Sequence, residues 1–241
     1  MIRTKLLGLA ALLPVVVACS TGSAAAATRS YGLTSFDRIR VTGPFDVHVH
    51  VGGSPSARAT GPQEAIDRLS VEQQGNQLVI KPLASGWGGW PTGFHGKLIV
   101  DVAAPAVSNV VVAGSGDVSI DRAKGDQLDV VLSGSGSLDI AAVEVTSLSA
   151  TLTGSGDLSL AGRSRQARAT VTGSGDLKGA GLVVDDATVS LVGSGDLAIG
   201  ARHTAKGHLA GSGDVTVAGP ATCAISHSGS GDVHCAHVAQ N

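Results

Sequence analysis

The sequence predicts an all-β protein built as a single-chain parallel β-helix, or β-solenoid, with about 20 residues per coil and Gly-Ser-Gly-Asp corners. The first observation is a repeat. Gly-Ser-Gly-Asp occurs six times, a Gly-Ser-Gly-Ser variant stands between the first two copies, and successive first glycines lie 18 to 20 residues apart. The second is that aromatic residues make up only 2% of the chain. A near-constant period indicates stacked coils, and scarce aromatics suit a narrow core of aliphatic side chains.

Apolar residues alternate with polar ones around each corner. Two residues before and four residues after the first glycine stand mainly Val and Leu, in the pairs Val112 and Val118, Leu132 and Leu138, Leu152 and Leu158, Val171 and Leu177, Leu191 and Leu197, and Leu209 and Val215. This period of two places one face of each strand in a core. Each coil is therefore strand, tight turn, strand, and right-handed winding is expected by analogy with parallel crossovers. A meander of hairpins would alternate likewise, but one identical short turn per two strands favours parallel coils.

The second connection of each coil is predicted to be variable. The segment from six residues before to six residues after the glycine always has 13 residues, so the connection takes up the variation in period and has 5 to 7 residues. Charged residues in or next to it include Arg163, Arg165, Arg168, Asp185 and Asp186. We interpret them as a solvated face, because small residues fill most of these connections.

Residues 1–18 are expected to be an export signal, because two positive charges precede an apolar run that is too short for a membrane span. Ala18-Cys19 resembles the bacterial lipoprotein box, which predicts lipidation of Cys19 and a membrane as partner through the lipid anchor. Ser20, the residue after the cysteine, resembles the signal for outer-membrane rather than inner-membrane sorting. The expected location is therefore the cell envelope, as an outer-membrane-anchored lipoprotein. The alternative is cleavage after Ala27, which would leave a periplasmic or secreted protein. Residues 19–34 are expected to form a tether with little structure.

Residues 35–104 are predicted to be an irregular N-terminal β part of the solenoid, followed by regular repeats over residues 105–238. Phe36–Val51 has Gly43-Pro44-Phe45-Asp46 at its corner and the apolar register of the repeats, which indicates a degenerate first coil. Next we expect a short helix over residues 62–69, a hairpin over 70–81 and a strand over 98–103.

The corner aspartates are predicted to form a column along the rod. Stacking places Asp157, Asp176, Asp196, Asp214 and Asp232 in an unbroken line, and Ser137 separates Asp117 from it. Carboxylates about 4.8 Å apart repel by roughly 0.9 kcal/mol in water, so they must be hydrated, hydrogen-bonded or bridged by cations. We favour hydrogen bonds from turn amides over calcium, because the calcium-binding nonapeptide repeat has a different spacing.

Cys223 and Cys235 occupy the inward positions six residues before and six residues after the last Gly-Ser-Gly-Asp, where they face each other across the final coil. An exported compartment permits a disulfide, and Cys19 is either lipidated or removed with the signal, which leaves an even pair. The sequence therefore predicts a disulfide between Cys223 and Cys235. The alternative is two buried free thiols.

Residues 85–96 hold both tryptophans of the chain and one of its three phenylalanines. Five glycines in these twelve residues indicate a loop rather than a strand. We favour a loop that caps the apolar core. The alternative is a contact surface that binds a ligand through Trp87, Trp90 and Phe94, with His95 as a polar neighbour.

Composition and motifs argue against several classes of function. A formal net charge of −2 gives no basic footprint, so no nucleic-acid partner is expected. Gly-Ser-Gly is followed by neither a helix nor a Lys-Ser/Thr ending, which argues against a phosphate loop. His48 and His50 could chelate a metal, but we assign them to the solvent face of a strand. We predict no metal, no cofactor and no catalytic residues, and therefore not an enzyme.

Three motifs in order carry a resemblance to a family. They are Phe36-Asp37-Arg38-Ile39 with Gly43-Pro44-Phe45-Asp46-Val47, then Gly75-Asn76-Gln77-Leu78-Val79-Ile80, then the Gly-Ser-Gly-Asp coils. Over residues 35–238 the chain resembles the bacterial "putative auto-transporter adhesin, head GIN domain" family, which implies an exported β-helix and supplies no catalytic residues. We expect a non-catalytic cell-envelope binding or adhesive module whose partner is a cell-surface glycan or protein. The alternatives are a structural envelope spacer and, less favoured, a β-helix carbohydrate-active enzyme.

Overall fold

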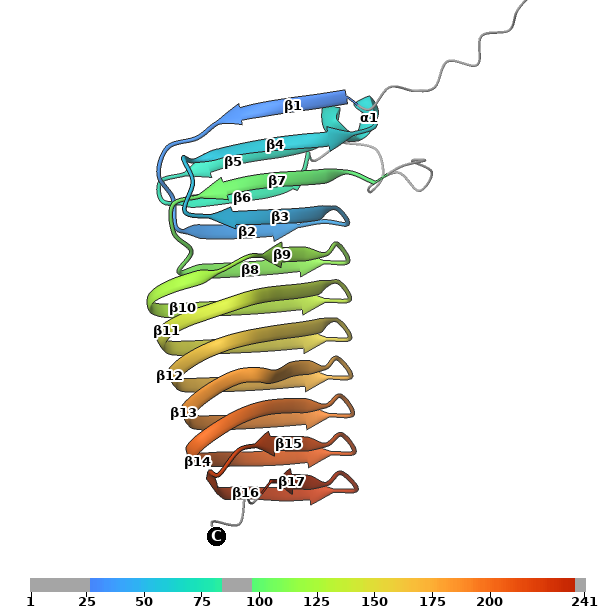
Figure 1. The fold of residues 1–241 in the computed structure, drawn as a ribbon. Coiled ribbons are helices and arrows are strands. Elements are labelled where there is room, and N and C mark those ends of the chain that lie inside the picture. The colour runs from blue at the N-terminus through green and yellow to red at the C-terminus, as the bar shows by residue number, and fades with distance from the viewer. Residues whose placement is uncertain (1–26, 84–96, 237–241) are drawn as a thin grey trace, which may run out of the picture.

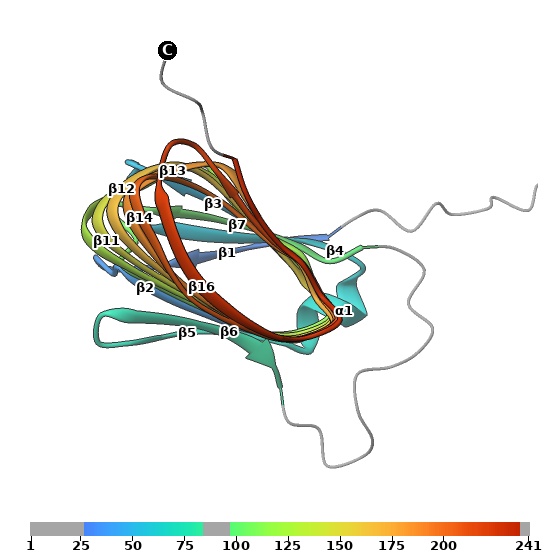
Figure 2. The same cartoon turned by 90° about the horizontal axis from the view of Figure 1, so that it is seen from below.

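The computed structural model describes residues 27–83 and 97–236. Within them, seventeen strands form a single continuous sheet that winds into a rod, and one short helix lies at its N-terminal end (Figure 1). Seen along the rod axis, the coils superpose into an oblong ring with a narrow end and a rounded end (Figure 2). The predicted all-β solenoid with parallel pairing about 20 residues apart is confirmed. Its right-handed winding stays a prediction.

The regular coils occupy the C-terminal part of the rod. Their strands are β8 (Asn109–Gly114), β9 (Val118–Ile120), β10 (Ala123–Gly134), β11 (Ser137–Gly154), β12 (Asp157–Gly173), β13 (Leu177–Gly193), β14 (Leu197–Gly211), β15 (Val215–Ala218), β16 (Thr222–Gly229) and β17 (Val233–Cys235). Each pairs in parallel with the strand one coil away, so that Leu132 lies beside Leu152 and Leu152 beside Val171. In β11, β12 and β13 the strand continues through the second connection, and register shifts there absorb the variation in coil length.

The core is a stack of like aliphatic side chains inside the ring. The residues two before and four after each corner glycine are at most 2% exposed from Val112 to Val215. On the last coil this pattern ends, because His227 is exposed and Val233 is only half-buried. Burial of a Val or Leu side chain stabilises the fold by about 1.5–3 kcal/mol, so the repeated inward pair is the main source of cohesion.

The two glycines of each corner are required for two different reasons. The first has a positive φ, for example 137° at Gly193, which residues with a side chain rarely adopt. The second has no positive φ, but a Cβ on Gly195 would overlap the carbonyl oxygen of Gly175 in the neighbouring coil. Successive corners therefore touch through their backbones. The sequence explained only the first glycine, because the second constraint exists only between coils.

The predicted first coil lies inside the stack. Its strands β2 (Arg38–Thr42) and β3 (Asp46–Val51) pair on one side with β8 and β9, so the register with the repeats holds. On the other side they pair with β6 (Gln77–Pro82) and β7 (Ile99–Ala104). The chain thus adds another coil outside its first one before it returns to build the regular repeats.

The N-terminal end is closed by antiparallel elements. Strand β1 (Ala27–Gly32) pairs with β4 (Ser56–Gly61), β4 pairs with β7, and β5 (Leu69–Gln74) forms a hairpin with β6. Helix α1 (Gln63–Asp67) turns Ala65 and Ile66 inward, and Leu69 after it is buried. The expected tether over residues 19–34 is wrong for residues 27–32, because these form β1. Arg29 fixes this strand by donating hydrogen bonds to the carbonyl oxygen of Ile66 (3.2 Å) and to Oδ1 of Asp67 (2.5 Å).

Candidate functional site

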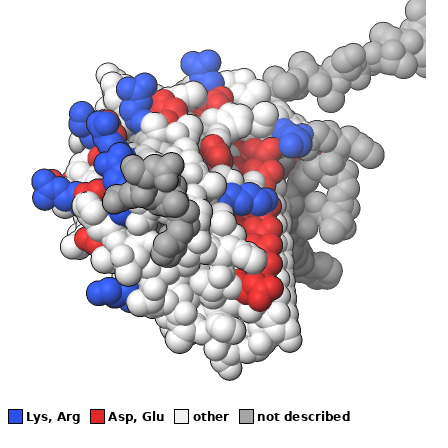
Figure 3. Space-filling view, turned by 60° about the horizontal axis from the view of Figure 1, so that its bottom comes forward, with Lys and Arg blue, Asp and Glu red and all other residues white. Residues whose placement is uncertain are grey.

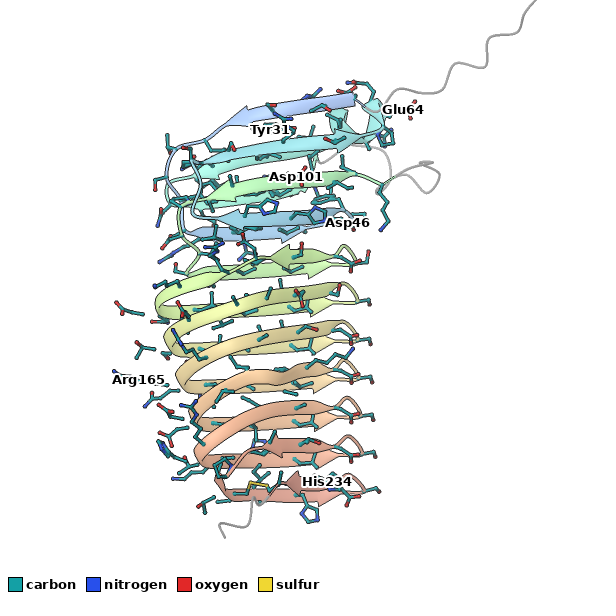
Figure 4. The ribbon with its side chains drawn as sticks, viewed as in Figure 1. Tyr31, Asp46, Glu64, Asp101, Arg165 and His234 are labelled. Carbon is teal, nitrogen blue, oxygen red and sulfur yellow. A yellow bond between two sulfur atoms is a disulfide. The ribbon has the colours of Figure 1, made fainter. Side chains whose placement is uncertain are left out.

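Two edges of the rod carry most of the repeated polar groups. We call the line of Gly-Ser-Gly-Asp turns the corner edge and the line of second connections the bend edge. Figure 4 shows Asp46 at the corner edge, on the right, and Arg165 at the bend edge, on the left. The space-filling view shows acidic side chains in a line along the right and most of the visible basic side chains on the left (Figure 3). On the face in view, acidic side chains thus line the corner edge, and basic side chains predominate on the other side, with fewer acidic ones among them (Figure 3).

The corner edge is a ladder of aspartates, as predicted. Each carboxylate accepts a hydrogen bond from the backbone amide one coil further along: Asp176 from Asp196, Asp196 from Asp214, and Asp214 from Asp232, each at 2.9 Å. Asp117 accepts from both the amide and the hydroxyl of Ser137, at 3.0 Å and 2.7 Å. Turn amides therefore hold the carboxylates, which agrees with the expectation from the sequence.

Asp157 leaves this pattern and forms an ion pair instead. Lys178, one coil further along, donates to its Oδ2 at 2.6 Å. The hydrogen bond with Asp157 raises the pKa of the Lys178 ammonium group above its usual value. At the N-terminal end of the ladder, Lys97 donates to Asp46 at 3.1 Å. Two of the corner carboxylates are thus neutralised by lysines.

His48 and His50 lie on the outer face of β3, where the sequence places them. Nδ1 of His48 is 3.3 Å from Oδ1 of Asp101, and Nδ1 of His50 is 3.8 Å from Oδ2 of Asp121. Each histidine thus faces a carboxylate, that of Asp101 on β7 or that of Asp121 directly after β9. Among the residues that the structure describes, no group of three or more His, Cys, Asp and Glu side chains is placed to hold a metal ion.

The bend edge contains two adjoining hollows, which we call the bend hollows. The larger has a volume of about 550 Å³ and is lined by Ser147, Leu148, Ser149, Gln166, Ala167, Arg168, Asp186, Ala187, Thr188, Thr204 and Lys206. The smaller has a volume of about 380 Å³ and is lined by Lys124, Gly125, Glu144, Val145, Thr146, Arg163, Ser164, Arg165, Val183, Asp185 and Arg202. They adjoin because neighbouring residues, such as Arg165 and Gln166, line one hollow each. Together they run over strands β10 to β14.

The bend hollows gather six basic and three acidic side chains. Glu144 forms ion pairs with both Lys124 and Arg163. Nη1 of Arg202 lies 3.9 Å from Oδ1 of Asp185, which makes a further ion pair. Ser164 is buried, and its hydroxyl donates to the carbonyl oxygens of Thr146 and Gln166. The sequence predicts charges at Arg163, Arg165, Arg168, Asp185 and Asp186 but not their assembly with Lys124, Arg202 and Lys206, because that assembly depends on register shifts between coils.

The other predicted site residues divide into two groups. Cys223 and Cys235 form a disulfide with a Cα–Cα distance of 6.6 Å, which closes the last coil as the sequence predicts. Trp87, Trp90, Phe94, His95 and Cys19 lie outside the described residues. Whether the aromatic segment caps the core or binds a ligand, and whether Cys19 is lipidated, stay predictions.

A protein-family model described as "Putative auto-transporter adhesin, head GIN domain" matches residues 35–221 of the chain. No curated protein sequence matches it. No helix within residues 27–83 and 97–236 is long and apolar enough to cross a membrane.

Solved structures show the same fold. A "putative adhesin" from Bacteroides fragilis has a TM-score of 0.80 and 22% identity, with 88% of this chain and 97% of that chain covered. A "putative lipid binding protein" from Parabacteroides distasonis has a TM-score of 0.72 and 21% identity, with 89% and 98% covered. A "putative adhesin" from Parabacteroides merdae has a TM-score of 0.67 and 20% identity, again with 89% and 98% covered.

Proposed function

The chain belongs to the "Putative auto-transporter adhesin, head GIN domain" family, and from this membership we propose that it is a non-catalytic binding or adhesive module of the bacterial cell envelope. The family description supports adhesion. The observation that carries the proposal is the surface of the solenoid. It repeats equivalent side chains once per coil, about 4.8 Å apart, over a rigid rod. Such a surface suits a ligand that is itself repetitive, such as an envelope polysaccharide.

We further propose that Cys19 is lipidated and anchors the protein in the outer membrane. Cys19 follows the apolar run of the signal, and the disulfide between Cys223 and Cys235 is typical of proteins outside the cytoplasm. Residues 20–26 lie between Cys19 and the first strand, a span of at most about 25 Å. This arrangement would hold the closed N-terminal end near the bilayer and direct the last coil away from it.

Binding and catalysis can be separated in one experiment. The full mature chain is applied to an array of envelope polysaccharides, peptidoglycan and cell-surface glycans, and released reducing sugars are measured in parallel. We expect retention on one class of glycan without release of sugar. Release of reducing sugar would support a β-helix carbohydrate-active enzyme. Retention on none of the surfaces would contradict the binding function and support a structural spacer.

A further inference from the structure

The bend hollows carry an excess of positive charge on a chain whose formal net charge is −2. Their lining includes Lys124, Arg163, Arg165, Arg168, Arg202 and Lys206, against Glu144, Asp185 and Asp186. Three of these cations, Arg165, Arg168 and Lys206, form no ion pair within the described part of the chain. An unpaired exposed cation can bind an anionic ligand without first breaking an internal pair.

Arg168 and Lys206 are in register along the axis of the rod. Arg168 on β12 pairs with Thr188 on β13, and Thr188 pairs with Lys206 on β14. The two cations are therefore two coils, or about 10 Å, apart. The side chains of Arg168, Thr188 and Lys206 all point outward and are exposed. The line that they form is parallel to the rod axis and runs along the larger bend hollow.

Neutral and acidic hydrogen-bonding groups lie beside this line. Gln166, Asp186 and Thr204 occupy the neighbouring register position on the same three strands. Thr204 donates to Oδ1 of Asp186 at 2.6 Å, and Asp186 is half-buried. The second carboxylate oxygen of Asp186 and the amide of Gln166 are thus available for hydroxyl groups. A row of hydrogen-bonding groups thus runs beside the row that contains the two cations.

We propose that the larger bend hollow binds an acidic polysaccharide, laid along the rod axis, whose carboxylates or sulfates recur about once per disaccharide. One acidic group pairs with Arg168 and the next with Lys206, while sugar hydroxyls bind Gln166 and Asp186. An extended disaccharide has a length similar to the spacing of two coils, so an acidic group on every second sugar matches the two cations. This inference rests on the proposed binding function and names its ligand class.

The observations favour a polysaccharide over other polyanions. A single-stranded nucleic acid binds best where its bases can stack on aromatic rings, and none of the described residues that line the bend hollows is aromatic. A membrane surface would not require cations to be aligned along one hollow with hydroxyl-binding groups beside them. On the opposite edge, the ladder aspartates that form no ion pair among the described residues repel polyanions, which directs them to the bend edge; they are Asp117, Asp176, Asp196, Asp214 and Asp232.

Calorimetric titration of the full mature chain tests the proposal. Hyaluronate, with one carboxylate per disaccharide, is the probe, and carboxyl-reduced hyaluronate is its uncharged match. We expect binding of hyaluronate that weakens as salt is raised, and little binding of the reduced form. The double variant Arg168→Gln/Lys206→Gln is expected to bind about tenfold more weakly, since each exposed ion pair contributes up to about 1 kcal/mol. Its melting temperature should equal that of the wild type.

The matched control is Arg40→Gln/Arg58→Gln. It removes two exposed arginines that form no ion pair among the described residues and lie outside the bend hollows. It should change the affinity less than twofold, as expected for charges remote from the site.

Each other outcome overturns a defined part of the argument. Equal affinity of the wild type and the Arg168→Gln/Lys206→Gln variant would reject this site while the binding function stands. Equal affinity for hyaluronate and its reduced form would reject charge recognition. Binding to phosphatidylglycerol vesicles but not to hyaluronate, or to neither, would reject the polysaccharide. Failure on the whole glycan array described above would reject the binding function itself.

Discussion

The backbone amide of Asp196 donates a hydrogen bond to Oδ1 of Asp176, which lies one coil earlier, at 2.9 Å. The same contact joins Asp196 to Asp214 and Asp214 to Asp232. Each carboxylate of this series therefore stabilises the turn that follows it. Repulsion between neighbouring carboxylates, roughly 0.9 kcal/mol per pair in water, is offset by these hydrogen bonds.

Replacement of Asp196 is expected to separate hydrogen bonding from charge. Asp196→Ala removes the acceptor for the Asp214 amide and should lower the free energy of unfolding by about 1 kcal/mol. Asp196→Asn keeps an acceptor and removes a negative charge, so it should be close to neutral. Urea denaturation measures both. If Asn destabilised as much as Ala, the hydrogen bond would not be what the aspartate contributes.

Millimolar calcium should leave the melting temperature of the wild type unchanged.

Substitution of Gly195 by Ala is expected to be severe. The added Cβ would overlap the carbonyl oxygen of Gly175, which is backbone and cannot rotate away. Forced overpacking of this kind costs about 1–3 kcal/mol. The control is Ser194→Ala, since the Ser194 side chain is exposed at the tip of the same turn. Thermal unfolding should show a clear loss for Gly195→Ala and almost none for Ser194→Ala.

Removal of the disulfide is expected to loosen the last coil. Cys223 and Cys235 are 12 residues apart in sequence, and a bridge over a loop of this length stabilises by roughly 2–3 kcal/mol. Cys223→Ser/Cys235→Ser should lower the free energy of unfolding by that amount and speed hydrogen exchange in β16 and β17. Mass analysis of the non-reduced, unfolded wild type should find neither cysteine alkylated. Two alkylated thiols would contradict the bridge.

The N-terminal end is expected to respond to acid. Hydrogen bonds from Gln63 and Arg29 lower the pKa of Asp67 below its ordinary value of 3.8. A carboxyl group with a lowered pKa in the folded state adds stability above its ordinary pKa, and this stability is lost as the pH falls through the folded-state value. Protection of the β1 amides from hydrogen exchange should therefore be constant near neutral pH and decline below about pH 4.

Two variants check this assignment. Asp67→Asn should reduce the protection of β1 at neutral pH and flatten its decline in acid. Glu64→Gln alters a carboxyl group of the same helix that forms no ion pair among the described residues, and it should leave the profile unchanged. A profile for Asp67→Asn identical to that of the wild type would show that this carboxylate does not secure β1.

Lipidation of Cys19 is tested by fractionation. Cys19→Ala should move the protein from the membrane fraction to the soluble fraction, because two acyl chains hold a protein on a bilayer where one barely does. Sequencing of the mature N-terminus distinguishes the alternative. If the wild type were soluble and began at Thr28, the secreted form would be the correct one.

Local sequence patterns predicted the regular coils and the disulfide. The offsets of Leu132 and Leu138 from their shared corner define both strands of a coil, and the same offsets place Cys223 and Cys235 face to face. The aspartate ladder also follows from the repeat, because the contact between Asp176 and Asp196 needs only the assumption that coils stack. These features depend on residues within one coil or on equal positions in two.

Features that depend on pairing at a distance were missed. Ala27–Gly32 has no strong alternation, and it becomes a strand because β4 offers its backbone about 30 residues later. The sequence does not predict that β2 lies between β6 and β8 in the stack. The backbone of β2 can pair in parallel with a strand on either side, and the sequence does not specify which strand lies on which side. The bend hollows depend on register shifts between coils, such as that between Val184 and Asp186.

The position of β3 affects how the exported chain can fold. Among the described strands it pairs with β7 and β9 alone. The contact of His48 with Asp101 spans 53 residues, and that of Asp46 with Asp117, directly before β9, spans 71 residues. The aspartate contacts of the later coils span 18 to 20 residues. Because loop closure over a longer span costs more entropy, the repeats should zip together first. In a chain that emerges N-terminus first from a translocation pore, β3 therefore stays unpaired until β7 has followed it.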